Sequence, residues 1–164
     1  DYYLKLISAA PKTTKIILDT SGNKMIAGLR GGAYLIKPNL DELQEMTGEH
    51  YDSFDEMITG CGRLIEAGAE NVMLSLGRKG AILTDGDKAY FCKSATVAVN
   101  STVGAGDGMV AAAASMIEQN APYEDVLRCA VAAGTASVMT PGTNLFYKEN
   151  FIEIYRKIQV ERLR

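Results

Sequence analysis

A loop of small residues beside a carboxylate, Gly104-Ala-Gly-Asp107, has the residue types needed to bind an anion. Gly104, Ala105 and Gly106 carry little or no side chain, so the backbone there can approach a ligand closely. They lead into a helix predicted over residues 106–117, whose free N–H groups and dipole attract an anion such as a transferring phosphoryl group. Asp107 falls in the first turn, where its carboxylate could take the proton of an attacking hydroxyl. The structural alternative is that Asp107 only satisfies the helix N-terminus and the glycines make a tight turn.

A second polar cluster, Lys37-Pro-Asn-Leu-Asp-Glu42, follows a predicted strand. Asn39 and Glu42 could supply an amide oxygen and a carboxylate to hydrated Mg²⁺, an ion that proteins usually hold through water and few direct ligands. Lys37 could face the phosphates of a nucleotide. The alternative is a helix cap, with Asn39 at the N-cap and Glu42 three residues later, although the capping box properly begins with Ser or Thr.

A third candidate is the loop Ser75-Leu-Gly-Arg-Lys-Gly80, into which another predicted strand runs. Its glycines, Gly77 and Gly80, could let the phosphates of ATP contact the backbone at Ser75 and Gly77. The alternative is a plain β-turn in which Arg78 is solvated.

A run of small residues surrounds Ala133 and Gly134 late in the chain. Its simplest interpretation is close packing of a helix against the sheet. The same residues could also form the flat, apolar wall of an adenine pocket.

The composition indicates one globular domain and excludes several functions. The 164 residues carry a formal net charge of −3, and 47 % are hydrophobic, so a basic face for nucleic acid is disfavoured. The longest apolar stretch, residues 109–117, is far shorter than the ~20 residues that cross a bilayer. Three cysteines without a Cys-x-x-Cys pair, together with the single histidine His50, argue against disulfides, zinc clusters and histidine-based triads. We therefore expect a cytoplasmic protein that binds neither nucleic acid nor a membrane.

The elements that must position these residues alternate along the chain. Apolar strands without alternation, separated by helices, predict an α/β fold with a mostly parallel sheet and helices on both faces. In such sheets ligands bind at the carboxyl ends of the strands, which singles out the loops 37–39, 75–80 and 100–107. Strands are predicted at 16–18, 34–36, 72–75, 81–84, 89–92 and 97–99, and helices at 2–10, 23–29 with Asn23 as its cap, 40–47, 54–67, 106–117, 122–138 and 151–160.

The sequence opens inside a predicted helix that has no cap and no preceding strand. A doubly wound sheet would normally have strands before this point. We therefore expect these residues to be a portion of a longer protein.

The three motifs, in this order, resemble those of the ribokinase-like carbohydrate kinases. The pattern Lys37-Pro-Asn-x-x-Glu, then Ser75-x-Gly-x-x-Gly-Ala, then Val103-Gly-Ala-Gly-Asp is similar to the phosphofructokinase B group, which includes 1-phosphofructokinase and tagatose-6-phosphate kinase. Asp19-Thr-Ser-Gly22 also matches that group. The resemblance implies that residues 1–164 are the carboxy-terminal, ATP-binding portion of a single ribokinase-like kinase domain, without the amino-terminal strands and the β lid.

The resemblance also implies roles for the candidate residues in MgATP-dependent transfer of the γ-phosphoryl group to a sugar phosphate. Asp107 would accept the proton of the substrate hydroxyl, beside an anion hole for the transferring group. Asn39 and Glu42 would position Mg²⁺ through its waters. The anion hole would be Gly104, Ala105 and Gly106, with Lys37 near the phosphates, Ser75, Gly77, Arg78 and Gly80 lining them, and Ala133 and Gly134 at the adenine.

Several functions remain open within this resemblance. Fructose 1-phosphate, giving fructose 1,6-bisphosphate, is the expected acceptor, because Asn100-Ser precedes the glycines where tagatose enzymes tend to have Asn-Pro. Tagatose 6-phosphate is the alternative. From other classes, the chain could bind nucleotide without catalysis, or serve as a non-catalytic interaction scaffold. A homodimer built through the lid is expected only of the full-length protein.

Overall fold

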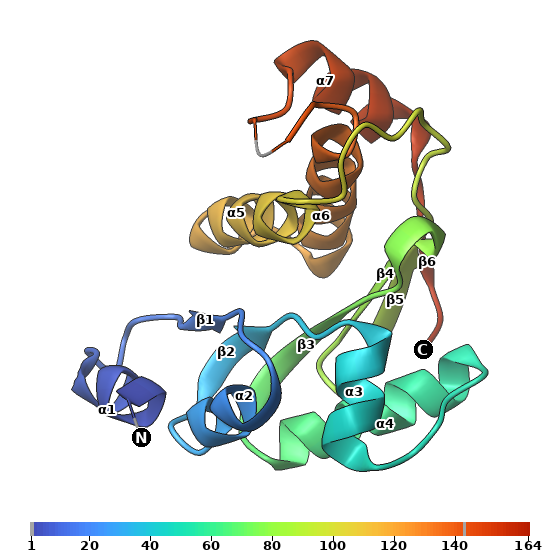
Figure 1. Ribbon diagram of the computed structural model, residues 1–164. Helices are drawn as coiled ribbons and strands as arrows, with labels where there is room; N and C mark the ends of the chain where they lie inside the picture. Colours follow the sequence, from blue (N-terminus) through green and yellow to red (C-terminus); the bar gives the residue numbers. More distant parts are fainter. Residues whose placement is uncertain (1, 143) are drawn as a thin grey trace. The chain divides into compact units, whose positions relative to one another are not determined.

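The computed structural model describes residues 2–142 and 144–164, and the chain divides into two compact units. The first unit runs to Leu76 and includes Ile82–Ala89 and Arg164, while the second holds Gly77–Ala81 and Tyr90–Leu163. Helices separate the strands up to residue 75, as the sequence predicts, and three successive helices lie between the strands at 89–92 and 160–162 (Figure 1). Because the division falls between Ser75 and Gly77, the candidate residues up to Ser75 lie in the first unit and those from Gly77 onward lie in the second.

Within the described residues, six strands follow one another in a single sheet in the order of the chain. The pairs β1–β2 and β2–β3 are parallel, and the pair β5–β6 is antiparallel. The last strand was not expected, and the strand predicted at 97–99 is wrong, since the structure assigns none there and Val99 is 61 % exposed. The strands are β1 (Ile17–Leu18), β2 (Ala33–Ile36), β3 (Ala69–Ser75), β4 (Ala81–Thr84), β5 (Ala89–Cys92) and β6 (Val160–Arg162).

The core of the first unit is built on β3. Its consecutive residues Val72, Met73 and Leu74 are all completely buried, so both faces of the strand are covered. This is the pattern that a parallel sheet requires, and the helices α3 (Leu40–Thr47) and α4 (Phe54–Glu66) contact this strand. The two remaining helices of the unit, α1 (Tyr2–Ala9) and α2 (Gly22–Leu29), contact each other.

Local signals set the helix boundaries of the first unit. Ser53 caps α4 in a capping box, in which its hydroxyl accepts from the N–H of Glu56. Gly48 ends α3 with a φ of +72°. The prediction that Asn23 caps α2 is wrong. The helix begins at Gly22, and Ser21 before it has an extended backbone, so Asn23 lies within the first turn.

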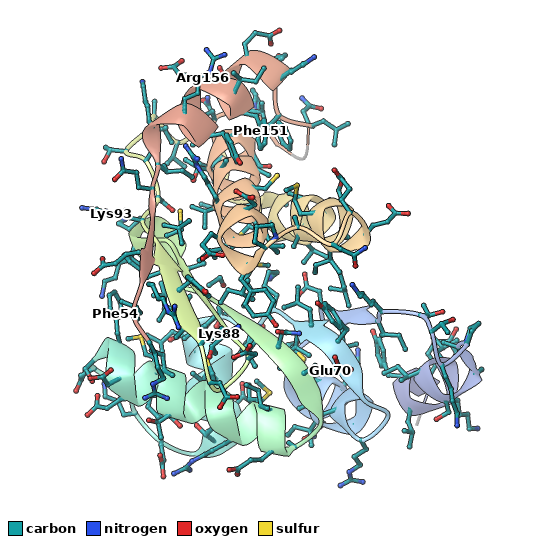
Figure 2. The ribbon with its side chains drawn as sticks, turned by 180° about the vertical axis from the view of Figure 1, so that it is seen from behind. Phe54, Glu70, Lys88, Lys93, Phe151 and Arg156 are labelled. Carbon is teal, nitrogen blue, oxygen red and sulfur yellow. The ribbon has the colours of Figure 1, made fainter. Side chains whose placement is uncertain are left out.

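The second unit is formed by the helices α5 (Ala105–Glu118), α6 (Tyr123–Ser137) and α7 (Lys148–Lys157), with a short 3₁₀ turn at Gly77–Lys79. Helices α5 and α6 pack against each other (Figure 1). Arg128 of α6 contacts Tyr155 of α7 in two ways. Its Nε donates to the carbonyl oxygen of Tyr155 (2.9 Å), and its guanidinium lies 4.3 Å from the centroid of the Tyr155 ring. Phe151, labelled in Figure 2, stacks on the same ring.

Tyr51 in the first unit is buried to 4 % exposure against Gly60, and among the described residues its hydroxyl has no hydrogen-bond partner. A buried hydroxyl without a partner costs about 1–3 kcal/mol. We expect Tyr51→Phe to leave the free energy of unfolding unchanged or to raise it by about 1 kcal/mol. Urea unfolding measures this, with Tyr51→Ala as the control that empties the site and destabilises. A clearly lower free energy of unfolding in Tyr51→Phe would mean that the hydroxyl has a hydrogen-bond partner, such as a buried water.

Candidate functional site

The carboxyl ends of three parallel strands bring polar residues together in the first unit. Asp19 follows β1, Lys37 follows β2 and Ser75 ends β3. The side chain of Lys37 is buried, with its Nζ 3.3 Å from Oδ1 of Asp19. The N–H of Ser75 donates to the carbonyl oxygen of Pro38 (2.9 Å), so the last two strand ends are joined. This edge combines a cation, a carboxylate and a hydroxyl where open α/β sheets bind their ligands.

Asn39 and Glu42 form a complete capping box at the start of α3. The N–H of Glu42 donates to Oδ1 of Asn39, and the N–H of Asn39 donates to Oε2 of Glu42, both at 2.8 Å. The capping alternative is therefore present, with Asn in the position that Ser or Thr usually takes. It does not exclude a metal role, because the carboxylate uses one oxygen for the cap and Asn39 is exposed.

The donor set at this cap fits a hydrated Mg²⁺ better than a directly ligated one. An amide oxygen and a carboxylate are ligands that Mg²⁺ accepts, usually together with several waters. Within residues 2–142 and 144–164, no group of three or more His, Cys, Asp or Glu side chains could hold a metal ion by itself. Asn39 and Glu42 would thus act through the ion's waters, and this role stays a prediction.

In the second unit, Gly104 turns the chain into α5. Its φ of +84° lies in the left-handed region, and a Cβ there would meet no atom within 4 Å, so conformation and not space favours glycine. The first intrahelical bond runs from the N–H of Gly108 to the carbonyl oxygen of Gly104 (2.9 Å), which leaves the N–H groups of Gly106 and Asp107 ahead of the helical ladder. Asp107 is exposed. The start of α5 therefore presents backbone donors beside an accessible carboxylate.

The loop before α5 is held by the end of α6. The N–H of Asn100 donates to the carbonyl oxygen of Val138 (2.8 Å), and its side-chain Nδ2 donates to that of Met139 (2.7 Å). Ala105 is tied to the loop itself, because its N–H faces the carbonyl oxygen of Thr102 at 3.5 Å. Of the three small residues predicted as an anion hole, Ala105 thus has its N–H directed back into the turn.

Ala133 and Gly134 are buried in the contact between α6 and α5. A Cβ on Gly134 would lie 2.6 Å from Cγ of Met109 and 3.2 Å from the carbonyl oxygen of Ala105. A Cβ on Gly108 would lie 2.6 Å from Oγ of Ser137. The close packing of Gly134 is therefore with the helix α5, where contact with the sheet was expected. The position of Ala133 and Gly134 at an adenine stays a prediction.

Residues 77–79 of the loop that follows β3 form the 3₁₀ turn of the second unit. Gly77 and Arg78 are exposed, as a solvated turn requires, and the N–H of Gly80 donates to the carbonyl oxygen of Gly77 (3.1 Å). Gly80 is buried with a φ of +118°, and a Cβ on it would overlap the carbonyl group of Cys92. This backbone contact by itself explains the glycine at position 80.

The structure thus groups the predicted residues in two sets, one in each unit. Sequence reasoning missed two positions. Asp19 could have been found from the register of two adjacent parallel strands, which places it beside Lys37. No pattern in the sequence points to the structural role of Asn100, because Met139, whose carbonyl oxygen accepts from its side chain, lies 39 residues away. The first set is Lys37, Asn39, Glu42 and Ser75, and the second is Gly77, Arg78, Gly80, Gly104, Ala105, Gly106, Asp107, Ala133 and Gly134.

The cysteines offer no nucleophile at neutral pH. Burial raises the pKa of the Cys61 thiol to about 12 and that of Cys92 to about 11. Burial also raises the pKa of Cys129, and Asp125 adds to this shift. Because the thiolate is the reactive form, these side chains act as small core residues.

No helix in the described part of the chain has the length and apolar character needed to cross a membrane.

Comparison with known proteins identifies relatives over nearly the whole chain. The model of the family described as "pfkB family carbohydrate kinase" matches residues 1–150. The 1-phosphofructokinase of Borreliella burgdorferi is 34 % identical over 141 residues, which are 85 % of this chain and 46 % of the relative. The ATP-dependent 6-phosphofructokinase isozyme 2 of Escherichia coli is 35 % identical over 154 residues, which are 92 % of this chain and 50 % of the relative. The chain thus spans about half the length of these curated relatives.

A solved structure of Arabidopsis thaliana ribokinase, complexed with ribose and ATP, superposes with a TM-score of 0.83. It covers 94 % of this chain and 52 % of the ribokinase, at 24 % sequence identity. At this identity the likeness concerns the fold alone, and it confirms the predicted ribokinase-like α/β class.

Proposed function

Because the chain belongs to the pfkB family of carbohydrate kinases, we propose that it is the carboxy-terminal, ATP-binding portion of a kinase domain that phosphorylates a sugar phosphate. The observation that carries the proposal is the start of α5, where Gly104 turns the chain and Asp107 stands exposed in the first helical turn. A carboxylate beside free backbone N–H groups suits a reaction in which a hydroxyl attacks a phosphoryl group.

The reaction at this helix end is the transfer of the γ-phosphoryl group of ATP to an acceptor hydroxyl. A bond forms between the hydroxyl oxygen and the γ-phosphorus, while the bond from that phosphorus to the bridging oxygen of ADP breaks. Asp107 accepts the hydroxyl proton, and it also orients the hydroxyl, because the transition state is loose and the proton leaves late. The N–H groups at the start of α5 stabilise the charge on the transferring group.

The strand ends of the first unit are proposed to hold the nucleotide phosphates. Lys37 supplies the positive charge, and Asn39 and Glu42 orient the waters of Mg²⁺. Bound Mg²⁺ would neutralise charge on the phosphates. Ser75, Gly77, Arg78 and Gly80 are proposed to line the phosphates, and Ala133 and Gly134 to back the adenine.

We propose fructose 1-phosphate as the acceptor, with fructose 1,6-bisphosphate as the product. The similarity to a 1-phosphofructokinase and the Asn100-Ser start of the third motif support this choice. Fructose 6-phosphate is a second candidate, because a relative named 6-phosphofructokinase isozyme 2 is equally similar. Tagatose 6-phosphate remains the alternative named from the motifs alone. A coupled assay of ADP release in the whole protein, with the three sugars at equal concentration, ranks them.

The rival from another class is nucleotide binding without catalysis. Titration calorimetry of the 164-residue chain with a non-hydrolysable ATP analogue, with and without Mg²⁺, tests the step that both functions share. We expect a dissociation constant in the micromolar range with Mg²⁺ and weaker binding without it, since the phosphates then lack their counter-ion.

Lys37→Met and Lys5→Met provide a matched pair for this titration. Both remove one ammonium group, but Lys37 is buried at the strand ends and Lys5 is exposed in α1. Binding should weaken in the first variant and persist in the second. Absence of binding to a folded parent chain at millimolar analogue, checked by circular dichroism, would contradict an assembled nucleotide site.

A further inference from the structure

Among the described residues, the ammonium group of Lys37 has one ion-pair partner, the carboxylate of Asp19. Lys37 is 8 % exposed, and its Nζ lies 3.3 Å from Oδ1 of Asp19. The side chain of Asp19 is 31 % exposed, so the carboxylate that pairs with this buried ammonium is itself partly reached by solvent. A buried charge is costly unless it is paired, which makes this carboxylate the group that allows a cation at this position.

The pairing follows from the register of two parallel strands. Leu18 of β1 lies opposite Ile36 of β2, and the next residue along each strand is Asp19 and Lys37 respectively. Neighbouring strands lie about 4.8 Å apart, so side chains one step beyond such a pair can meet. Asp19 and Lys37 both lie just beyond the carboxyl ends of their strands. At the same edge of the sheet Ser75 ends β3, and its N–H donates to the carbonyl oxygen of Pro38.

An ammonium group has three donors, and the contact with Asp19 occupies one direction only. The carboxylate thereby orients the lysine without using all of its N–H donors. The remaining donors can bind an anion at the same edge of the sheet. A lysine head is otherwise a flexible point charge that must lose side-chain freedom to bind.

We propose that Asp19 is a positioning residue that holds the ammonium of Lys37 in place for a phosphate of the bound nucleotide. The inference rests on the proposed function, because it concerns the same phosphate site. It adds a residue and a mechanism: Asp19 acts through Lys37 and does not itself touch the nucleotide or the metal ion.

A double-mutant cycle on the 164-residue chain tests this coupling with the Mg²⁺-bound, non-hydrolysable ATP analogue as the probe. We expect Asp19→Asn, which keeps the size of the side chain and removes its charge, to weaken binding about tenfold. Asp19→Asn should have no further effect in a Lys37→Met background, because the residue through which it acts is gone. Asp19→Glu should restore part of the affinity, since it returns the charge.

Asp55→Asn is the matched control. Asp55 is exposed in the first turn of α4 in the same unit, so the variant makes the same change in charge without touching the pair. It should bind the analogue as the parent does. Thermal unfolding of each variant separates loss of binding from loss of fold, and Asp19→Ser replaces Asp19→Asn if the latter does not fold.

Each remaining outcome counts against the inference. Unchanged affinity in folded Asp19→Asn would show that Lys37 needs no positioning. An equal loss in the Lys37→Met background would mean that Asp19 acts on the ligand directly, and a loss that disappears without Mg²⁺ would place it at the metal. If the parent chain itself does not bind, the proposed function fails and takes this inference with it, whereas binding without coupling overturns the inference alone.

Discussion

Replacing Asp107 with Ala should lower turnover by a factor of about 10²–10⁴ while nucleotide affinity stays within about twofold of the parent. The carboxylate is exposed in the first turn of α5, so its removal disturbs no packing. The backbone N–H groups at the start of the helix belong to the main chain and survive the substitution. Loss of the proton acceptor should therefore reduce the transfer step without removing the anion site.

The measurement is the rate of ADP formation at saturating ATP and sugar phosphate in the whole protein, together with calorimetric affinity for the ATP analogue. Asp107→Asn is the more conservative variant, since it keeps the shape of the side chain. It should likewise lower turnover without lowering nucleotide affinity. Glu118→Gln is the matched control, because Glu118 is an exposed carboxylate at the opposite end of the same helix. Turnover within about tenfold of the parent would remove Asp107 from its role.

Gly80→Ala should cost about 3 kcal/mol or more of unfolding free energy, against about 1 kcal/mol for Gly77→Ala. Gly77 begins the 3₁₀ turn of the second unit and Gly80 directly follows it. Both have positive φ, +118° at Gly80 and +57° at Gly77. At Gly77 a Cβ would meet no atom within 4 Å, so only the backbone conformation is penalised. At Gly80 the Cβ would overlap the carbonyl oxygen of Cys92 and lie 2.9 Å from its carbon, and a strand backbone cannot easily give way.

Urea unfolding followed by circular dichroism compares the two variants, and the calorimetric titration follows on whichever remain folded. Gly77→Ala is the informative variant for nucleotide binding, because it leaves the fold nearly intact while adding a methyl group to an exposed turn. Equal losses of stability in the two variants would show that the strand near Cys92 can move. A stable Gly77→Ala with unchanged affinity would argue against phosphate contact at that position.

The expected and observed elements agree best where a helix boundary depends on neighbours within four residues. Ser53 and Glu56, and likewise Asn39 and Glu42, satisfy each other's backbone N–H groups across one turn, so the sequence pattern contains the whole interaction. The same holds for Gly48, whose positive φ ends α3. The ordered motifs were also sufficient to predict the carbohydrate kinase family, which the family match over residues 1–150 confirms.

Apart from the Asn23 cap, which is a local error of one or two residues, the predictions that failed concern pairing between distant segments. Val97–Val99 has strand-like residues but no strand, whereas Val160–Arg162 pairs with β5 although two of its three residues are exposed. The partners of β6 lie about 70 residues earlier in the sequence, and Val160 meets Cys92 only in the folded chain. Strand formation depends on such partners more than on intrinsic preference.

Short-range patterns account for the capping boxes at Asn39 and Ser53, the small-residue turn before Asp107, and the order of the three motifs from which the family follows. The capping boxes and the turn depend on backbone conformation and on hydrogen bonds between residues close in the chain. The close contacts that require glycine at positions 80 and 134 are found only in the folded chain, as is the position of Asp19 against the buried ammonium of Lys37. Burial and steric overlap are properties of atoms that the fold brings together from distant positions, and no residue pattern of short range contains them.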